Sequence, residues 1–436
     1  MFKTLINALK NPEVRIKVLI TLGLLILFRI GCWLPVPGIN YATAGTVAAD
    51  GSLLSLLSTV TGGALANGAF LAIGISPYIN ASIIIQLLTV AIPKLEDWSK
   101  QGDEGRKKIN TVTRFVTMIL AVVQAIGITI SWSNSNGIHT EMFAGSFLET
   151  QWVLCIFIGI MLVCGSMFTM WLGDRITENG VGNGISLLIY VGILSSTGLS
   201  IVATFESMAN GSETAIWELL GFMLMAVLIF GFIVYVDLAE RRIPIQYAKQ
   251  IKGRKQYGGQ STHIPLKVNA SGVLPIIFAT AIITFPQLLA QIFWPTSDFY
   301  AWWSEYLGTG TVLYSIALAL LILGFAYFYA KIQFNPEEVA RNIQQYGGFI
   351  PGIRPGAPTL DYLNKVTKRV TLFGAIYLAI IALIPSILIG LITGGNTTLV
   401  NAMTSTGMLI VVSVALEFDK QLQALMMTKH YKGFLK

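Results

Sequence analysis

The residue types that most often carry catalysis or bind cofactors are sparse in this chain. Its three histidines (His139, His263 and His430) are scattered and lack the spacing of metal ligands. Residues 179–184 read Asn-Gly-Val-Gly-Asn-Gly, but no strand precedes them and the spacing is not Gly-x-Gly-x-x-Gly. A tight turn that opens a helix is the better interpretation. We therefore expect no catalytic site, no metal site and no cofactor.

Groups that drive nucleotide hydrolysis or ion-coupled transport are also missing. The sequence has no Gly-x-x-x-x-Gly-Lys-Ser/Thr motif, which excludes a P-loop. Its apolar runs hold few carboxylates, and Glu218 and Glu417 lie near predicted helix ends. A proton- or sodium-coupled carrier places ionisable groups at the bilayer midplane. The three cysteines (Cys32, Cys155 and Cys164) lie in apolar runs, which indicates packing rather than disulfides.

The composition is that of a membrane protein with many spans. Hydrophobic residues make up 54% of the 436 and charged residues only 12%, and the mean hydropathy is +0.68. A soluble chain carries about a quarter charged residues. Apolar runs long enough to cross a bilayer predict ten helices, near 18–34, 69–92, 112–132, 152–172, 184–203, 216–236, 271–294, 311–333, 370–393 and 399–417.

The lysines and arginines predict how these spans are oriented. Outside the helices they occur only in alternate segments, beginning with the amino-terminal tail and ending with the carboxyl tail. The intervening loops contain none: 35–68, 133–151, 204–215, 295–310 and 394–398. The positive-inside rule then places both termini in the cytoplasm. The first run carries Arg29 and lacks a small-residue cleavage site, so we expect it to be an uncleaved span.

One stretch, residues 52–88, does not behave like an ordinary span. Its first apolar piece has about ten residues, or roughly 15 Å as a helix, against a hydrocarbon core of about 30 Å. The second piece starts at residue 69 and contains a proline and the amides Asn80 and Gln86. Broken backbone at membrane depth needs protein or water around it. The stretch is therefore a candidate plug or re-entrant loop inside a pore or carrier.

Two basic loops, 237–270 and 334–368, are too long to be simple turns. Both mix arginine with tyrosine or phenylalanine. Exposed arginines and aromatic residues suit a docking surface for a protein or for RNA phosphates.

Five motifs carry a resemblance to a known family. They occur in order along the chain: Gly74–Ser82 (GISPYINAS), Asn179–Gly184 (NGVGNG), Arg241–Pro244 (RRIP), His263–Asn269 (HIPLKVN) and Phe349–Gly356 (FIPGIRPG). Together they resemble the SecY family of protein-conducting channels, and the resemblance runs through nearly the whole chain.

The resemblance implies an all-α fold of two pseudo-symmetric five-helix halves, 1–205 and 206–436, with a short plug half-helix near 53–65. An hourglass pore would lie between the halves, closed at its waist by a ring of six isoleucines: Ile75, Ile79, Ile185, Ile189, Ile277 and Ile410. Two pairs in this set are four residues apart, so each pair shares one helical face. Such a ring would exclude ions because water does not wet a narrow passage lined by aliphatic side chains.

The resemblance also assigns the plug and a side exit toward lipid. The plug residues would be Leu53, Leu54, Leu56, Leu57, Gly62, Gly63 and Leu65. The exit, or lateral gate, would lie between the second and third helices on one side and the seventh and eighth on the other. Its lining candidates are Asn80, Gln86, Gln124 and Phe285.

Partners follow from the same resemblance. The two long loops would dock the ribosome and the motor ATPase SecA, through Arg241, Arg242, Lys249, Arg254 and Arg354. The small subunits SecE and SecG, precursor polypeptides and membrane lipid complete the set, in the plasma membrane of a bacterium. Energy would come from the partner, because the chain has no nucleotide motif, and we expect no enzyme activity.

Two alternatives remain. A secondary transporter would also contain a broken helix, but it needs ion ligands or charges at the midplane. A membrane scaffold for other proteins would not need the plug-like break. The apolar waist favours a gated conduit for unfolded polypeptide.

Overall fold

The structure is a computed structural model of the whole chain. It describes residues 2–40, 58, 61–134, 137–138, 150–209, 214–247, 250–252, 255–257, 261–269, 272–294, 297–308, 311–392 and 405–433. Most of the predicted plug, including Leu53, Leu54, Leu56 and Leu57, lies outside these residues, as do Lys249 and Arg254.

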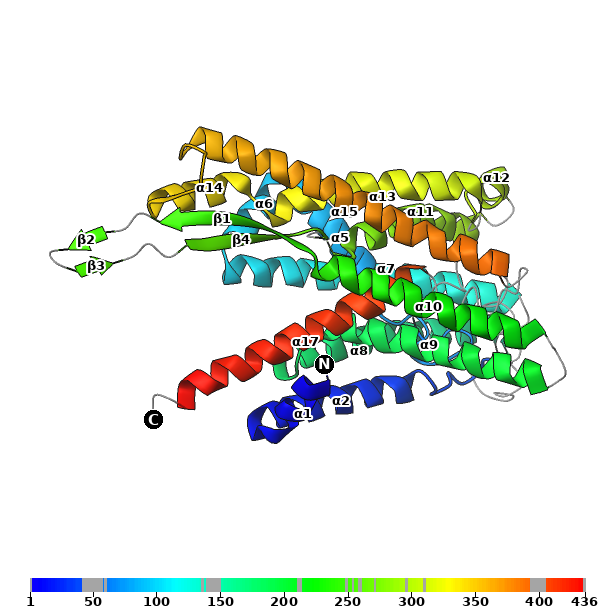
Figure 1. Cartoon of the computed structure of the whole chain (residues 1–436). Coiled ribbons are helices and arrows are strands. Elements are labelled where there is room, and N and C mark those ends of the chain that lie inside the picture. Colours follow the sequence, from blue (N-terminus) through cyan, green and yellow to red (C-terminus); the bar gives the residue numbers. More distant parts are fainter. Residues whose placement is uncertain are drawn as a thin grey trace.

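A helix lies at each of the ten predicted places (Figure 1). These helices are α2 (Pro12–Gly31), α5 (Ser76–Ala91), α7 (Asp103–Asn134), α8 (Gln151–Asn179), α9 (Gly184–Ala209), α10 (Thr214–Leu238), α11 (Leu274–Phe293), α13 (Val312–Gln333), α15 (Ala357–Ile392) and α17 (Ser405–Gly433). Within the described residues, six are long and apolar enough to cross a membrane. A seventh candidate is α5 together with α6 (Pro93–Lys100), a pair bent by 100°.

The predicted span at 69–92 differs from expectation at its start. Its helix begins only at Ser76, because residues 61–75 form turns and Gly74 has a positive φ of 58°. This irregular segment is enclosed by protein. The buried hydroxyl of Ser166 on α8 donates to the carbonyl oxygen of Gly74 (3.1 Å), and Leu71 is fully buried. Enclosure is what broken backbone at membrane depth requires.

Two apolar cores organise the bundle. One joins α10, α11, α13, α15 and α17 around fully buried side chains such as Ile233, Ile276 and Leu378. The other joins α2, α8, α9, α17 and the turns before α5. A neighbouring apolar cluster packs α7 against α8 and so adds α7 to this second group. The two groups of helices meet where α7 contacts α11, where α9 contacts α10, and along α17.

The two long loops build one small folded unit outside the apolar runs. A three-stranded sheet has the order β4-β1-β5, with β1 (Glu240–Tyr247) antiparallel to both β4 (Ser261–Lys267) and β5 (Gly348–Phe349). Strands β2 (Gln250–Lys252) and β3 (Lys255–Tyr257) pair with each other further out. The fold remains mostly helical, with this sheet added to it.

The sheet has its own core. Ile243 and Leu266 pack with side chains from α14 (Pro336–Gln345) and from the first turns of α15, including Leu363 and Val366. This packing explains why α15 begins at Ala357, well before its apolar run. The two loops are therefore one preformed surface.

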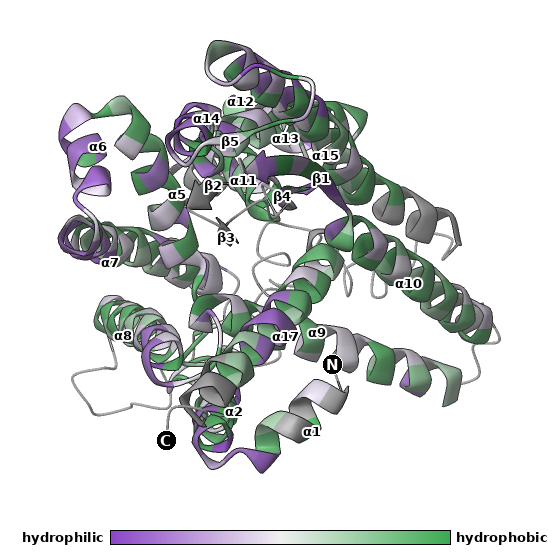
Figure 2. Ribbon diagram, turned by 60° about the vertical axis from the view of Figure 1, so that its left-hand side comes forward, coloured by the Kyte–Doolittle hydropathy of each residue, from purple (hydrophilic) through white to green (hydrophobic). Residues whose placement is uncertain are grey.

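The ends of the molecule agree with the predicted alternation of loops. In Figure 1 the sheet and the carboxyl end of α17 extend to the left, while α12 (Asp298–Tyr306) lies at the right-hand end. Helix α12 falls in the loop 295–310, which was predicted to face the other side of the membrane. Helix α1 (Phe2–Lys10) contacts α2 and α17. In the ribbon of Figure 2, green apolar residues run along the long helices, and purple polar residues gather at α6, α14 and part of α7.

Candidate functional site: an apolar waist between helices

Five of the six predicted ring isoleucines belong to one apolar cluster. Ile75 and Ile189 are buried members of the cluster, 5% and 7% exposed, and Ile79, Ile185 and Ile410 pack against the cluster half-buried. They come from three separate places in the sequence: the turn before α5 with its first turn, the start of α9, and α17. The structure thus brings together residues that are up to 335 positions apart (410 minus 75). We name this cluster the waist.

The sixth residue, Ile277, is not among the described members of the waist. It lies half-buried in the first turn of α11, and its neighbour Ile276 is fully buried in the core of the other helix group. Its assignment to the ring stays a prediction.

Hydrogen bonds where α5 and α9 begin fix the backbone that carries the two isoleucine pairs. The amide of Ile79 donates to the carbonyl oxygen of Ile75 (3.1 Å), so both lie on one face where α5 begins. The glycine motif at 179–184 is the tight turn predicted from the sequence, with Gly182 at a φ of 94°. Its Asn183 side chain accepts from the amide of Ile185 (3.2 Å) at the start of α9.

Additional side chains complete the waist cluster. Val414 is 9% exposed and lies four residues after Ile410, on the same face of α17. Val411 and Tyr78 pack there half-buried. The i, i+4 spacing from Ile410 is a signal in the sequence that points to Val414, whereas Tyr78 is identified only by the fold.

The described end of the predicted plug is held against three helices, α2, α7 and α8. Gly62 and Gly63 have positive φ angles of 69° and 85°. Nη2 of Arg29 in α2 donates to the carbonyl oxygen of Gly62 (3.4 Å), and among the described residues Nη1 has no partner. Leu65 is 2% exposed and packs in a neighbouring apolar cluster with Trp132 and Leu154. The cation inside the first span therefore faces protein rather than lipid.

The predicted gate residues lie on helices that meet at one seam. Helix α7 packs against α5 on one side and α11 on the other, which makes α7–α11 a contact between the two helix groups. Gln124 on α7 is buried, and Asn80 on α5 and Phe285 on α11 are half-buried. Gln86 is exposed, and its amide donates to the hydroxyl of Ser82 (3.4 Å).

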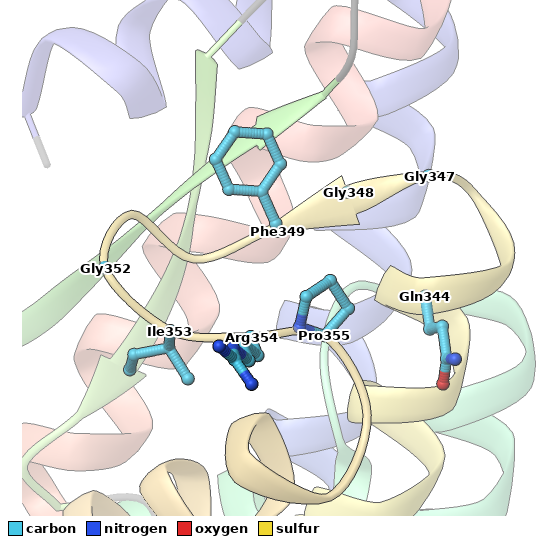
Figure 3. Close-up of a pocket in the computed structure, with 8 residues that line it drawn as sticks. All are labelled: Gln344, Gly347, Gly348, Phe349, Gly352, Ile353, Arg354 and Pro355. Atoms are coloured by element: carbon cyan, nitrogen blue, oxygen red, sulfur yellow. The ribbon is translucent and has the colours of Figure 1, made fainter.

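Three of the predicted docking arginines lie on the sheet unit. Arg241 and Arg242 are exposed on β1, and Nε of Arg242 donates to Glu240 (2.7 Å). Arg354 lies on the loop after β5 and lines an open pocket of about 630 Å³. In Figure 3 this loop carries Ile353 and Arg354, with Phe349 on the strand before it and Gln344 nearby.

The described residues hold no group of three or more His, Cys, Asp or Glu side chains that could bind a metal ion. The three cysteines are free thiols. Physically, the clustered aliphatic side chains form a compliant surface that water and ions do not wet.

A bundle of long apolar helices with an apolar cluster shared between them and a preformed polar face is the architecture of a multi-span membrane protein. The sequence model of the family described as SecY matches residues 69–418. Two curated relatives named protein translocase subunit SecY cover this chain and their own length completely: that of Halalkalibacterium halodurans is 40% identical, and that of Mycobacterium bovis is 39% identical.

Solved structures share the fold. The one titled "The structure of a protein conducting channel" has a TM-score of 0.63 at 20% identity, with 96% of each chain covered. A Sec61 chain in a canine ribosome-channel complex gives 0.61 at 19% identity, again covering 96% of each. The chain belongs to the SecY family of protein translocase subunits. The alternative of a secondary transporter finds no support in these relatives.

Proposed function

We propose that this chain forms the polypeptide-conducting pore of a bacterial translocase and that the waist is its seal. The observation that carries the proposal is the gathering of Ile75, Ile79, Ile185, Ile189 and Ile410 in one apolar cluster. Aliphatic side chains at a constriction disfavour water and ions, and they can part around an extended chain without breaking hydrogen bonds. Ile277 would complete the ring when α11 moves.

The plug would close the pore from one side of the waist. Gly62 and Gly63 supply the conformational freedom of a hinge, and Arg29 holds the near end of that hinge. The pore would lie between the predicted halves, 1–205 and 206–436; α9 itself continues to Ala209. The lateral gate would open where α7 leaves α11, past Gln124 and Phe285.

The sheet unit would dock the partners that supply precursors and energy. Arg241, Arg242 and Arg354 are exposed cations on a rigid scaffold, which suits RNA phosphates or acidic protein surfaces. A relative's structure with a ribosome supports the ribosome as one partner. SecA, SecE and SecG are proposed as further partners, Lys249 and Arg254 as further contacts, and the chain itself as a conduit without enzyme activity.

The location proposed is the bacterial plasma membrane, with both termini in the cytoplasm. The absence of lysine and arginine from alternate loops supports this orientation of the chain in the membrane. The sheet unit then faces the cytoplasm, where ribosomes and a motor can reach it.

The deciding experiment places a photo-crosslinking amino acid at Ile79 and supplies a precursor stalled halfway through translocation. We expect a crosslink to the translocating segment that disappears when the signal sequence is removed. The same probe at Ile126, which is 48% exposed on α7, is the matched control and should crosslink to lipid instead. If Ile79 does not crosslink in an assembled, active translocase, the pore does not pass through the waist.

A further inference from the structure

A buried polar junction lies where the sheet unit joins the helices. Asp237, near the end of α10, accepts two hydrogen bonds: Nδ2 of Asn269 donates to its Oδ1 (2.8 Å), and the hydroxyl of Ser413 on α17 donates to its Oδ2 (2.8 Å). Asn269 is 8% exposed. Hydrogen bonds to a carboxylate are among the stronger ones in proteins, so this carboxylate ties three segments together.

The Asn269 segment is held firmly by the sheet and by α15. The amide of Val268 donates to the carbonyl oxygen of Ala239, just before β1 (3.1 Å). On α15, a Cβ added at Gly374 would lie 2.5 Å from the carbonyl oxygen of Val268, so the two backbones are in direct contact. A displacement of the sheet is therefore passed to Asn269 and Asp237 together.

Two atoms at this junction lack partners. Within the described part of the chain, Oδ1 of Asn269 and the hydroxyl of Tyr377 on α15 make no hydrogen bond. Tyr377 is 6% exposed, and its ring contacts that of Phe232 (5.7 Å between centroids) on α10, the helix that carries Asp237. A buried hydroxyl without an acceptor is costly, so an arrangement that pairs it is favoured.

We propose that Asp237 is a positioning residue that couples the sheet unit to the waist through an exchange of hydroxyl partners. In the described arrangement Asp237 holds Ser413. In the other arrangement the Tyr377 hydroxyl donates to Asp237, and Ser413 is released. Ser413 lies three residues after Ile410 and one before Val414 on α17, so its release frees the part of α17 that carries these two waist side chains. This inference rests on the proposed function, since it needs a docking face and a waist.

The exchange predicts opposite effects for two small substitutions. Ser413→Ala removes the hydroxyl that ties α17, and we expect translocation of a precursor with a defective signal sequence to rise about tenfold, as for the loss of a hydrogen bond to a charged group. Tyr377→Phe removes the competing hydroxyl and should lower that translocation below wild type. Ser413→Thr keeps the hydroxyl and should behave like wild type. Binding of purified ribosomes should change less than about twofold in all three variants, because the docking face is untouched.

A distance measurement tests the junction without any translocation assay. Spin labels would be placed at Thr262→Cys on β4 and Lys420→Cys on α17, both exposed positions, in full-length protein with its three native cysteines replaced. We expect Ser413→Ala and Asp237→Asn to broaden the distance distribution. The control is Ser315→Ala, which removes a hydroxyl that donates to the carbonyl oxygen of Thr311 at the start of the same helix, α13 (3.1 Å). It should leave the distance distribution unchanged.

The outcomes separate this inference from the proposed function. An unchanged distribution in Ser413→Ala overturns the junction, whatever the translocation assay gives. Equal effects of Ser413→Ala and Tyr377→Phe on translocation overturn the exchange. If the wild-type protein fails to translocate in an assembled translocase while Ser413→Ala still broadens the distance distribution, the proposed function is overturned and the junction is supported.

Discussion

At the scale of single residues, the proposed hinge of the plug includes a glycine with little space around it, Gly62. Gly62 combines a φ of 69° with close contact to Arg29 and to the backbone of Gly192. Gly102 has a nearly identical φ of 70° but open space around it. Comparing substitutions at Gly62 and Gly102 therefore separates the free-energy cost of a positive φ from the cost of crowding against Arg29.

We expect Gly62→Ala to lower stability more than Gly102→Ala. Each substitution pays about 1 kcal/mol or more for a positive φ, and only Gly62→Ala also displaces the Arg29 guanidinium. Thermal unfolding of the purified protein in detergent measures both. Equal shifts of Tm would show that the Arg29 contact does not position the plug end.

The waist makes a second prediction at this scale. Ile79→Asn and Ile410→Asn would each place an amide among aliphatic side chains, which costs the closed state about 1–3 kcal/mol. We expect looser closure, seen as increased translocation of precursors with defective signal sequences. Ile126→Asn, on an exposed face of α7, is the control. Unchanged dependence on the signal sequence in both waist variants would argue against the seal.

At the scale of elements, apolar run length predicts where helices lie but not where they end. Helix α15 starts at Ala357, although its apolar run begins near residue 370, because Leu363 and Val366 pack against the sheet. The sheet itself was not predicted. Its signal is the short alternation of Ile243 and Ile245 on β1, and pairing with a strand that follows a long insertion is a tertiary outcome.

The candidate site is likewise only partly predictable from the sequence. The family resemblance selected all six isoleucines, and spacing adds only that Ile75 with Ile79, and Ile185 with Ile189, share a helical face. Only the fold brings α17, with Ile410, to the same cluster. The junction at Asp237 has no sequence signal, because its partners lie 32 and 176 residues away.

We expect that the sheet unit can unfold while the membrane helices stay folded. Ile243→Ala removes a side chain that is 1% exposed in the sheet core. This should lower the free energy of unfolding of the sheet unit by about 2–4 kcal/mol. We expect limited proteolysis to cut within 237–270 far faster, while the helical circular dichroism stays the same. Gln246→Ala, exposed on the same strand, should resist like wild type. Equal resistance of both variants would mean that the sheet is held from the membrane side.

At the scale of the whole molecule, α17 connects both cores. Met408, Leu409 and Val412 face the core of α10, α11, α13 and α15, while Ile410 and Val414 face the waist. Any motion of one helix group against the other must shift this helix. Opening at the α7–α11 seam and loosening of the waist are therefore expected to be one event.

Locking the seam tests this coupling. Gln124→Cys with Phe285→Cys, joined by a flexible bifunctional maleimide in a background without native cysteines, should tie α7 to α11. We expect both lateral insertion of membrane segments and translocation of secretory precursors to fall to background, because the waist cannot open while the seam is closed. Leu318→Cys with Ile381→Cys, joined in the same way within one core, is the control and should leave both activities intact. If the locked seam blocks insertion but not translocation, the waist opens independently of the seam, and α17 does not link the two.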